Sequence, residues 1–210
     1  MAIQSSFKNM VLCLSVICIV CSTLLAVVYA VTAAPIQAAA EAKTNAAIAQ
    51  VVPPFEGSPE EGAVSVDGTE YPYYTVSGAS GVAGYAIISS GSGFSGAVQV
   101  MGGFYPDGKI YNTAVLSQAE TPGLGAKCVE PEFRDQFKDF DPAVKKLSVA
   151  KDGGDVNAIT ASTITSRAFC DALNGAVRAF NAITGASKPV DASSGATASG
   201  DMGKDVEDAK

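Results

Sequence analysis

The 210-residue sequence contains no histidine. Histidine is a common general base near neutral pH and a common ligand of zinc and haem iron, so its absence argues against those kinds of site. Any chemistry must therefore depend on carboxylates, hydroxyls, thiols or a bound cofactor. The chain also lacks an excess of basic residues, because its net charge is −7. Without a basic surface to replace the counterions of phosphate groups, we expect no nucleic-acid partner.

No charged residue lies between Lys8 and Glu41. Within this stretch, residues 11–31 are almost continuously apolar, and as a helix they would span about 30 Å, the thickness of a bilayer core. We therefore expect residues 1–34 to form a single transmembrane anchor in the inner cell membrane. Because Lys8 precedes the apolar run, the positive-inside rule places the N-terminus in the cytoplasm and the remaining chain outside. A cleaved signal peptide is the alternative, although its apolar region usually has about 7 to 15 residues.

Three further regions follow the anchor. Residues 35–62 begin with an alanine-rich stretch that favours a helix as far as the Pro53-Pro54 pair, and they end in a short linker. Residues 63–185 carry the signals of one folded domain. Residues 186–210 are mainly small and charged residues with little to bury, and we expect a disordered tail there.

The domain is predicted to be α+β, with a small antiparallel sheet followed by a C-terminal amphipathic helix. Runs of β-favouring residues between turn signals predict strands at 63–66, 73–76, 82–89, 96–104, 109–116 and 145–149. A short helix is predicted at 130–137. A long helix is predicted at 163–183, because apolar residues recur there with a period near 3.6. Those residues are Ile164, Ala168, Phe169, Ala172, Leu173, Ala176, Val177, Phe180 and Ile183.

Residues 91–96 read GSGFSG and match the glycine pattern of dinucleotide-binding proteins. That pattern requires a strand before it and a helix after it. Here residues 97–100 read AVQV, which is typical of a strand. We therefore interpret residues 91–96 as the tip of a hairpin.

The five cysteines leave two questions open. Cys18 and Cys21 form a CxxC pair inside the apolar segment, with Cys13 one to two turns earlier. They could ligate a metal at an interface with another chain, or they could serve as small apolar residues of a membrane helix. Cys128 and Cys170 could pair across the domain, which sequence alone does not decide.

Residues 119–127 read AETPGLGAK. A proline and two glycines give this loop a sharp shape that lets its backbone approach a flat ligand closely. An ordinary turn between a strand and a helix is the plain alternative. The residues that would offer a ligand an acceptor, a hydroxyl, space and a cation are Glu120, Thr121, Gly123, Gly125 and Lys127.

Hydroxyl residues crowd the start of the long helix, in the segment 157–168 that reads NAITASTITSRA. One of them would suffice as an N-cap. The N-terminus of a helix also attracts anions, because its free N–H groups and its dipole both favour negative charge. The segment is therefore consistent with simple capping or with a phosphate-bearing ligand on a threonine.

Together these segments resemble the G subunit of the Rnf ion-translocating ferredoxin:NAD oxidoreductase complex, and more distantly the C subunit of the Na⁺-pumping NADH:quinone reductase. The resemblance covers residues 9–184 and rests chiefly on ETPGLGAK followed by TASTITSRA at the start of a helix. It implies an FMN-binding domain whose cofactor is joined by a phosphoester to a threonine, after transfer from FAD by a separate flavin transferase. It also implies an electron relay outside the membrane, between other subunits of a complex that transports Na⁺ or H⁺.

Carried over from the family, Thr163 is the threonine that bears FMN, and Thr165 stands beside it. The isoalloxazine ring would lie against Glu120, Thr121 and Leu124. The family motif D-x-x-S/T-G-A-T is altered at 157–163, but residues 191–197 read DASSGAT and match it literally, ending at Thr197. We prefer Thr163 because an amphipathic helix follows it, which gives the flavin a packed pocket.

Two other functions remain as alternatives. The same fold could serve as a flavin-free extracytoplasmic sensory or binding domain, which would purify colourless. An extracytoplasmic hydrolase is a weaker possibility, since no histidine is present to assist a nucleophile.

Overall fold

The computed structural model describes residues 7–79 and 81–185. It divides the chain into two units, of which the first ends at Asn45 and the second begins at Ala46. The first unit consists of most of helix α1, which runs from Phe7 to Val51. Among the described residues, α1 is the one helix that is long and apolar enough to cross a membrane.

Helix α1 continues through Pro35, where the sequence predicted the start of a second helix. Proline removes one N–H donor from a helix interior and disfavours it. Alanine, glutamine, glutamate and lysine are strong helix formers, and they dominate the residues that follow Pro35. The local preference of those residues therefore extends the helix beyond the proline.

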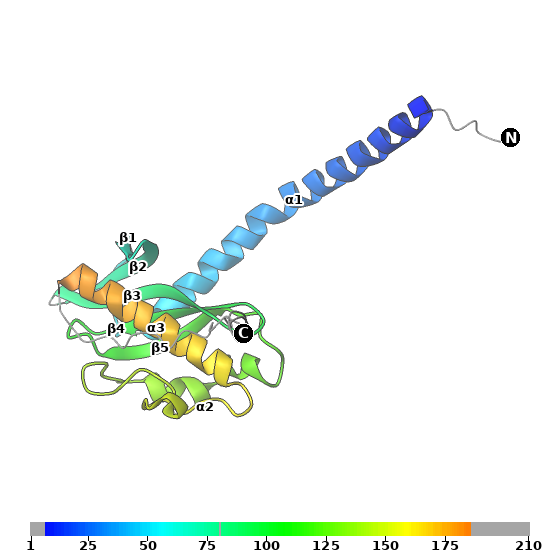
Figure 1. Ribbon diagram of the computed structural model, residues 1–210. Helices are drawn as coiled ribbons and strands as arrows, with labels where there is room; N and C mark the ends of the chain where they lie inside the picture. Colours follow the sequence, from blue (N-terminus) through cyan, green and yellow to red (C-terminus); the bar gives the residue numbers. More distant parts are fainter. Residues whose placement is uncertain (1–6, 80, 186–210) are drawn as a thin grey trace, which may run out of the picture. The chain divides into compact units, whose positions relative to one another are not determined.

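The second unit is built on a five-stranded antiparallel sheet in which every strand pairs with its neighbour in sequence, in the order β1 to β5 (Figure 1). The strands are β1 (Glu60–Val66), β2 (Thr69–Gly78), β3 (Gly81–Ser92), β4 (Ala97–Phe104) and β5 (Ile110–Ser117). Each of the first five predicted strands lies within or overlaps one of these. The turn between β3 and β4 also confirms that residues 91–96 belong to a hairpin.

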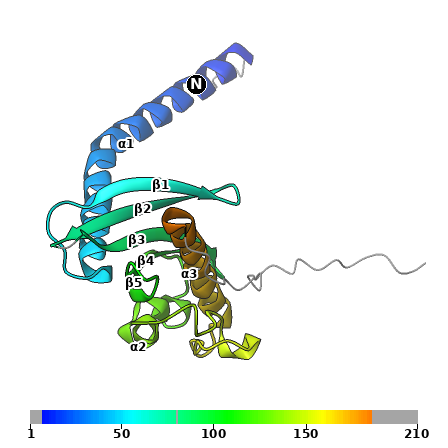
Figure 2. The same cartoon turned by 90° about the vertical axis from the view of Figure 1, so that its left-hand side faces the viewer.

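Helix α3 (Thr163–Thr184) covers one face of the sheet (Figure 2). Its buried stripe packs on β3 and β4, where Phe180 stacks on Phe104 with ring centroids 5.3 Å apart. Gly185 adopts the left-handed conformation that ends many helices. The predicted α+β class with a C-terminal amphipathic helix is therefore confirmed.

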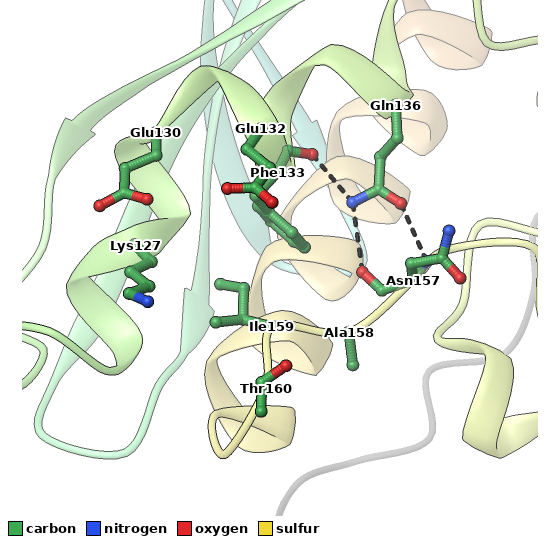
Figure 3. A pocket seen from close by; sticks show the side chains of 9 residues that line it. All are labelled: Lys127, Glu130, Glu132, Phe133, Gln136, Asn157, Ala158, Ile159 and Thr160. Carbon is green, nitrogen blue, oxygen red and sulfur yellow. Dashed lines mark hydrogen bonds between the residues drawn. The ribbon is translucent and has the colours of Figure 1, made fainter.

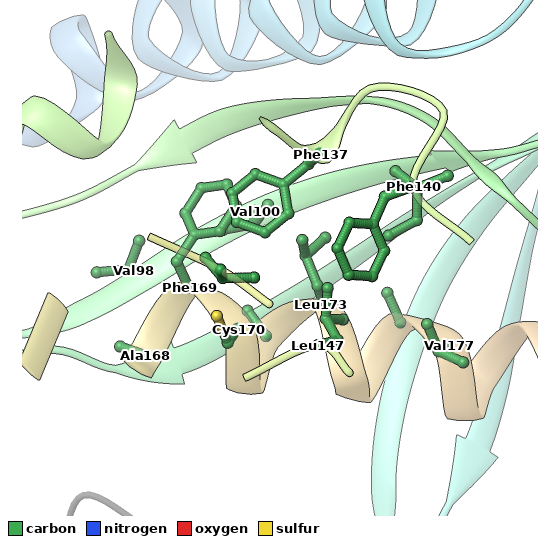
Figure 4. Close-up of a cluster of buried hydrophobic side chains, with 14 of the residues drawn as sticks. Val98, Val100, Phe137, Phe140, Leu147, Ala168, Phe169, Cys170, Leu173 and Val177 are labelled. Atoms are coloured by element: carbon green, nitrogen blue, oxygen red, sulfur yellow. The ribbon is translucent and has the colours of Figure 1, made fainter. Parts of the chain in front are cut away.

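The chain between β5 and α3 closes the side of this core. It contains three short 3₁₀ segments, η1 (Gly125–Val129), η2 (Asp135–Phe137) and η3 (Ala150–Asp152), and the single helical turn α2 (Pro131–Arg134). Figure 4 shows Phe137, Phe140 and Leu147 from this connection pointing toward Phe169 and Leu173 of α3. Apolar side chains on an irregular backbone thus seal the core.

The strand predicted at 145–149 does not form. Leu147 and Val149 are buried, but the backbone pairs locally instead of joining the sheet. The N–H of Ser148 donates to Lys146, the N–H of Val156 donates to Ser148, and Val149 and Val156 share only an isolated bridge. The β-favouring residues at 145–149 therefore supply buried side chains, while their backbone finds its hydrogen-bond partners within the loop.

The other face of the sheet is covered by the last residues of α1. Ala47, Ile48 and Val51 are buried there against a cluster that includes Met101 and Leu116. Adjacent residues of a strand point to opposite faces of the sheet, so β3 and β4 present apolar side chains to both faces. The core of the domain therefore begins near residue 46, upstream of the boundary at 63 that the sequence suggested.

Candidate functional site

Three segments distant in sequence enclose a cavity of about 410 Å³. They are the tip of the β3–β4 hairpin, the loop that follows β5, and the beginning of α3. Its volume lies within the range of roughly 300 to 1,000 Å³ that is usual for small-molecule sites. Six residues predicted from the sequence line this cavity: Glu120, Thr121, Leu124, Gly125, Thr163 and Thr165.

Glu120 holds the three segments together. Its side chain is buried, and one carboxylate oxygen accepts a 2.9 Å hydrogen bond from the N–H of Ser95 at the hairpin tip. The other oxygen accepts a 2.5 Å hydrogen bond from the hydroxyl of Thr165 in α3. The N–H of Glu120 itself donates to the side chain of Gln118. A buried carboxylate is tolerated only with such partners, and here its partners define the shape of the cavity.

The loop after Glu120 makes a tight turn. The N–H of Leu124 donates to the carbonyl of Thr121 at 3.2 Å, and Gly123 between them has a φ of +77°. Proline in the second position and a left-handed glycine in the third are typical of a type II turn. The turn brings Leu124 to the cavity wall with its side chain half exposed.

Gly125 is required for a different reason. A Cβ at this position would lie 2.5 Å from a carboxylate oxygen of Glu120 and 2.6 Å from the hydroxyl of Thr165. The absence of a side chain therefore lets η1 begin directly against the hydrogen-bonded pair. The space at Gly125 is taken by the Glu120–Thr165 pair, whereas the sequence suggested that the loop glycines make room for a flat ligand.

The first turn of α3 faces the cavity with unused donors. Ser162 is the N-cap residue, and its side chain makes no capping hydrogen bond. Its carbonyl accepts the first helical bond, from Ser166. No partner for the N–H groups of Thr163, Ile164 and Thr165 is found within the described part of the chain. Such free N–H groups at a helix N-terminus are suited to an anion.

The hydroxyls near this turn have separate tasks, which explains why so many occur. Ser166 accepts a hydrogen bond from the N–H of Ile159 and donates to the carbonyl of Ser162, so it fastens the preceding loop to the helix. Thr165 binds Glu120. Thr163 lies at the cavity, partly buried, and its hydroxyl accepts a 3.2 Å hydrogen bond from the amine of Lys151. Simple capping is therefore not the role of this cluster.

Two predicted site residues lie elsewhere. Lys127 belongs to a neighbouring cavity of about 250 Å³, with Glu130 and Thr160 (Figure 3). Gly123 is exposed in its turn and does not line the larger cavity. Figure 3 also shows the amide of Gln136 bonded to the backbone of Asn157, which fixes the loop that leads into α3.

The cavity has four further lining residues: Phe94, Ala161, Ser162 and Ile164. Sequence reasoning misses Phe94 because it treats residues 91–96 only as a glycine motif, although one large apolar residue at a hairpin tip is itself a signal. The side chain of Phe94 is 73% exposed. Helical spacing assigns Ile164 to the core, whereas its side chain is 40% exposed at the cavity. Periodicity does not distinguish a core from an apolar pocket.

The cysteines do not form a disulfide between residues 128 and 170, since both are buried free thiols. Burial raises the pKa of Cys128 to about 11 and that of Cys170 to about 12. Neither is therefore a thiolate near neutral pH. In the described residues, no group of three or more His, Cys, Asp or Glu residues is arranged to hold a metal ion. The alternative flavin acceptor, Thr197, lies outside those residues.

Comparison with known proteins places this site in a family. Residues 93–178 match the FMN-binding domain, a span that begins at the hairpin tip and ends inside α3. The G subunit of the ion-translocating oxidoreductase complex of Methanosarcina acetivorans is 32% identical over 186 residues, which cover 84% of this chain and 96% of that protein. The chain belongs to the family of G subunits of these complexes. The resemblance inferred from the sequence is thereby confirmed.

Two other similarities accompany this assignment. The G subunit of the proton-translocating ferredoxin:NAD(+) oxidoreductase complex of Clostridium ljungdahlii is 36% identical over 104 residues, which span 48% of this chain and 55% of that protein. The crystal structure of NqrC from Shewanella oneidensis is similar with a TM-score of 0.47 and 20% identity, covering 60% of this chain and 70% of that one.

Proposed function

We propose that this chain is the electron-transfer subunit of a membrane-bound, ion-translocating oxidoreductase complex of the Rnf type, and that FMN occupies the cavity at the start of α3. The observation that carries the proposal is the convergence of the ETPGLG loop, the hairpin tip and the N-terminus of α3 on one cavity. Membership of the G-subunit family and the match to the FMN-binding domain support the same function.

The residues present fit the two chemically different parts of FMN. Leu124, Ile164 and Phe94 offer apolar surface to a flat ring, and all three keep exposed area at the cavity. The free N–H groups at the start of α3 offer donors to a phosphate. Electron transfer is the chemistry that the flavin supplies when bound. The chain's own part is to bind it, orient it and shield one side of it from water.

Glu120 orients the site rather than reacting in it. Because both carboxylate oxygens already accept hydrogen bonds, from Ser95 and Thr165, this residue fixes the hairpin tip and α3 around the ligand. The hydroxyl of Thr121 and the ring-facing surface of Leu124 are then held by the tight turn that follows. Gly123 and Lys127 lie outside the cavity wall, and we assign them to the shape and charge of its surroundings.

We propose that Thr163 carries FMN through a phosphoester, formed when a separate flavin transferase moves FMN from FAD to the threonine hydroxyl, breaking the pyrophosphate bond of FAD and releasing AMP. Its hydroxyl is at the cavity, and the phosphate would meet the free N–H groups of α3 directly. We further propose that residues 1–34 anchor the chain, that the domain faces the extracytoplasmic side, and that other subunits of the complex exchange electrons with it. Transport of Na⁺ or H⁺ belongs to the whole complex.

The attachment site is tested by co-producing the full chain with a flavin transferase and locating the FMN adduct by mass spectrometry. Thr163→Val removes the hydroxyl with little change of shape and is expected to abolish the adduct and the fluorescent band on a denaturing gel. Thr163→Ser keeps a hydroxyl and is the matched control, so it should retain flavin. Thr197→Val should also retain it.

Each opposite result has a distinct meaning. An adduct that survives Thr163→Val but is lost in Thr197→Val would move the cofactor to the motif that ends at Thr197. Loss only in the double variant would mean two flavins per chain. A wild-type chain that purifies colourless and without adduct would favour the flavin-free binding domain.

A further inference from the structure

Lys151 brings a positive charge to the start of α3. Its amine donates a 3.2 Å hydrogen bond to the hydroxyl of Thr163. Thr163 is the first residue of α3, so the lysine lies beside the positive end of the helix dipole.

The lysine is presented by a well-fixed segment. It lies in η3, between the buried side chains of Val149 and Val156. The next residue, Asp152, makes two hydrogen bonds of 2.7 and 2.8 Å with the guanidinium of Arg167, one helical turn beyond Thr163. These bonds to Arg167 hold the pKa of the Asp152 carboxyl below its usual value. The ion pair therefore keeps η3 against the first turns of α3.

A cation at this position is electrostatically unfavourable unless an anion accompanies it. Helix N-termini are usually neutralised by a side-chain cap or by acidic residues in the first turn. In α3 the N-cap Ser162 makes no such bond, and the first turn has no acidic residue. The carboxylates that approach this end of the helix come from other segments and bind other groups, Glu120 to Thr165 and Asp152 to Arg167, and a lysine is added beside Thr163.

The nearby carboxylates are already engaged. Asp152 is paired with Arg167, and an oxygen of Asp155 accepts a hydrogen bond from the backbone of Lys146. Glu120 is buried on the cavity side and binds Ser95 and Thr165. The arrangement around Thr163 therefore combines one ammonium group and three free backbone N–H groups.

We propose that Lys151 is the phosphate-binding cation of this site, pairing with the phosphate group that Thr163 receives. The inference rests on the proposed FMN function, and it assigns to Lys151 the charge role that the sequence suggested for Lys127. A phosphodiester keeps one negative charge at neutral pH, and a lysine ammonium is a suitable point-charge partner for it. No proton transfer is required of Lys151.

The first test measures the reactivity of the lysines in the full-length chain. The protein is prepared with and without a flavin transferase, treated with an N-hydroxysuccinimide ester of acetate, and analysed by mass spectrometry. Lys151 should acetylate about five-fold more slowly in the flavin-bearing form, because a charge-assisted hydrogen bond to the phosphate would engage its amine and shield it from the reagent. Lys146, which lies on the same loop, is the control and should react equally in both forms.

The second test removes the charge. Lys151→Met preserves the length of the side chain and should slow flavin attachment about five-fold at low ionic strength, with a smaller effect in high salt because the interaction is screened. Lys151→Arg should attach flavin at close to the wild-type rate, and Lys146→Met should behave as wild type. The flavin-free Lys151→Met chain should unfold at no lower a temperature than wild type, because the lysine serves the phosphate and not the fold.

The outcomes separate this inference from the function on which it rests. A wild-type chain without any adduct would overturn both. The role of Lys151 alone would be overturned if the adduct is on Thr163 but Lys151 is equally reactive in the two forms. It would also be overturned if the Lys151→Met chain attaches flavin at the wild-type rate. An adduct mapped to Thr197 would overturn the inference and retain the flavoprotein. A flavin-free Lys151→Met chain that is markedly less stable would show that the contact with Thr163 is structural.

Discussion

Residue 161 has a left-handed backbone conformation, with a φ of +61°, although it is an alanine. It lies two residues before Thr163, at the position where the motif of the resembling family has glycine. The Cβ of an L-residue makes this conformation unfavourable by about 1 to 2 kcal/mol. Ala161 therefore adopts a conformation that glycine adopts at no such cost, and with it the segment 157–163 forms the turn into α3.

Replacing Ala161 with glycine is expected to stabilise the domain. The gain in backbone conformation is offset in part by the greater entropy of glycine in the unfolded chain, which leaves about 0.5 to 1 kcal/mol of net stabilisation. Denaturant unfolding of the full chain without flavin measures it. Ala143→Gly is the control, because that residue is exposed and has no positive φ, and it should be slightly destabilising. Equal effects at both positions would contradict the assignment of strain to residue 161.

The sequence could predict which residues of a short loop belong to the site. It could not predict which cavity each side chain faces. Glu120 and Thr165 are 45 residues apart in sequence and form one hydrogen bond, so their pairing depends on the complete fold. Lys127 is only seven residues from Glu120, yet η1 turns it toward a different cavity. Lys151 follows residues 145–149, for which the sequence predicts a strand, and its proximity to Thr163 depends on the 3₁₀ turn η3 that forms there instead.

At the scale of elements, the sheet was predictable because its strands are local. All five pair with sequence neighbours, and turn residues such as those at 106–108 mark the hairpins. The covering of the second face was not predictable in the same way. The alanine-rich end of α1 resembles an exposed helix in sequence, and its burial depends on how closely the sheet can approach it.

Gly103 of β4 allows that approach. A Cβ at this residue would overlap the backbone carbonyl of Val51, so the sheet could not reach the end of α1 without moving it. We expect Gly103→Ala to destabilise the domain by about 2 to 3 kcal/mol, as overpacking of a core typically does. Thermal and denaturant unfolding measure the loss, and proteolysis should cut more readily at residues 46–52.

Gly96→Ala provides the comparison for this substitution. A Cβ at Gly96 would meet the side chain of Ala119 at 3.4 Å, an ordinary contact, so a change well below 1 kcal/mol is expected. If Gly103→Ala were as mild as Gly96→Ala, the end of α1 would not be part of the domain core.

At the scale of the whole molecule, one helix contributes residues to two environments. The apolar residues of α1 near the N-terminus are exposed in the structure, whereas Ala47, Ile48 and Val51 near its C-terminus are buried in the domain. An uncharged stretch of this length is stable when surrounded by lipid, and α1 exceeds the roughly 20 residues that a membrane span requires. Sequence composition sufficed to predict a long apolar helix here, since its apolar part depends on no contact within the fold.

The fate of the N-terminus decides whether α1 is an anchor. Cleavage near residues 31 to 35 would still leave the helical residues that cover the sheet, so correct folding of the domain does not distinguish an anchor from a signal peptide. We predict that the mature protein keeps residues 1–34, as determined by intact mass, and that an N-terminal tag remains protected when protease is added outside intact spheroplasts. The domain should be digested in the same experiment, because the basic Lys8 keeps the N-terminus in the cytoplasm. Spheroplasts opened with detergent are the control and should lose the tag as well. A mature chain that begins near residue 31 or 35 would overturn the anchor, and a protected domain with a digested tag would reverse the orientation.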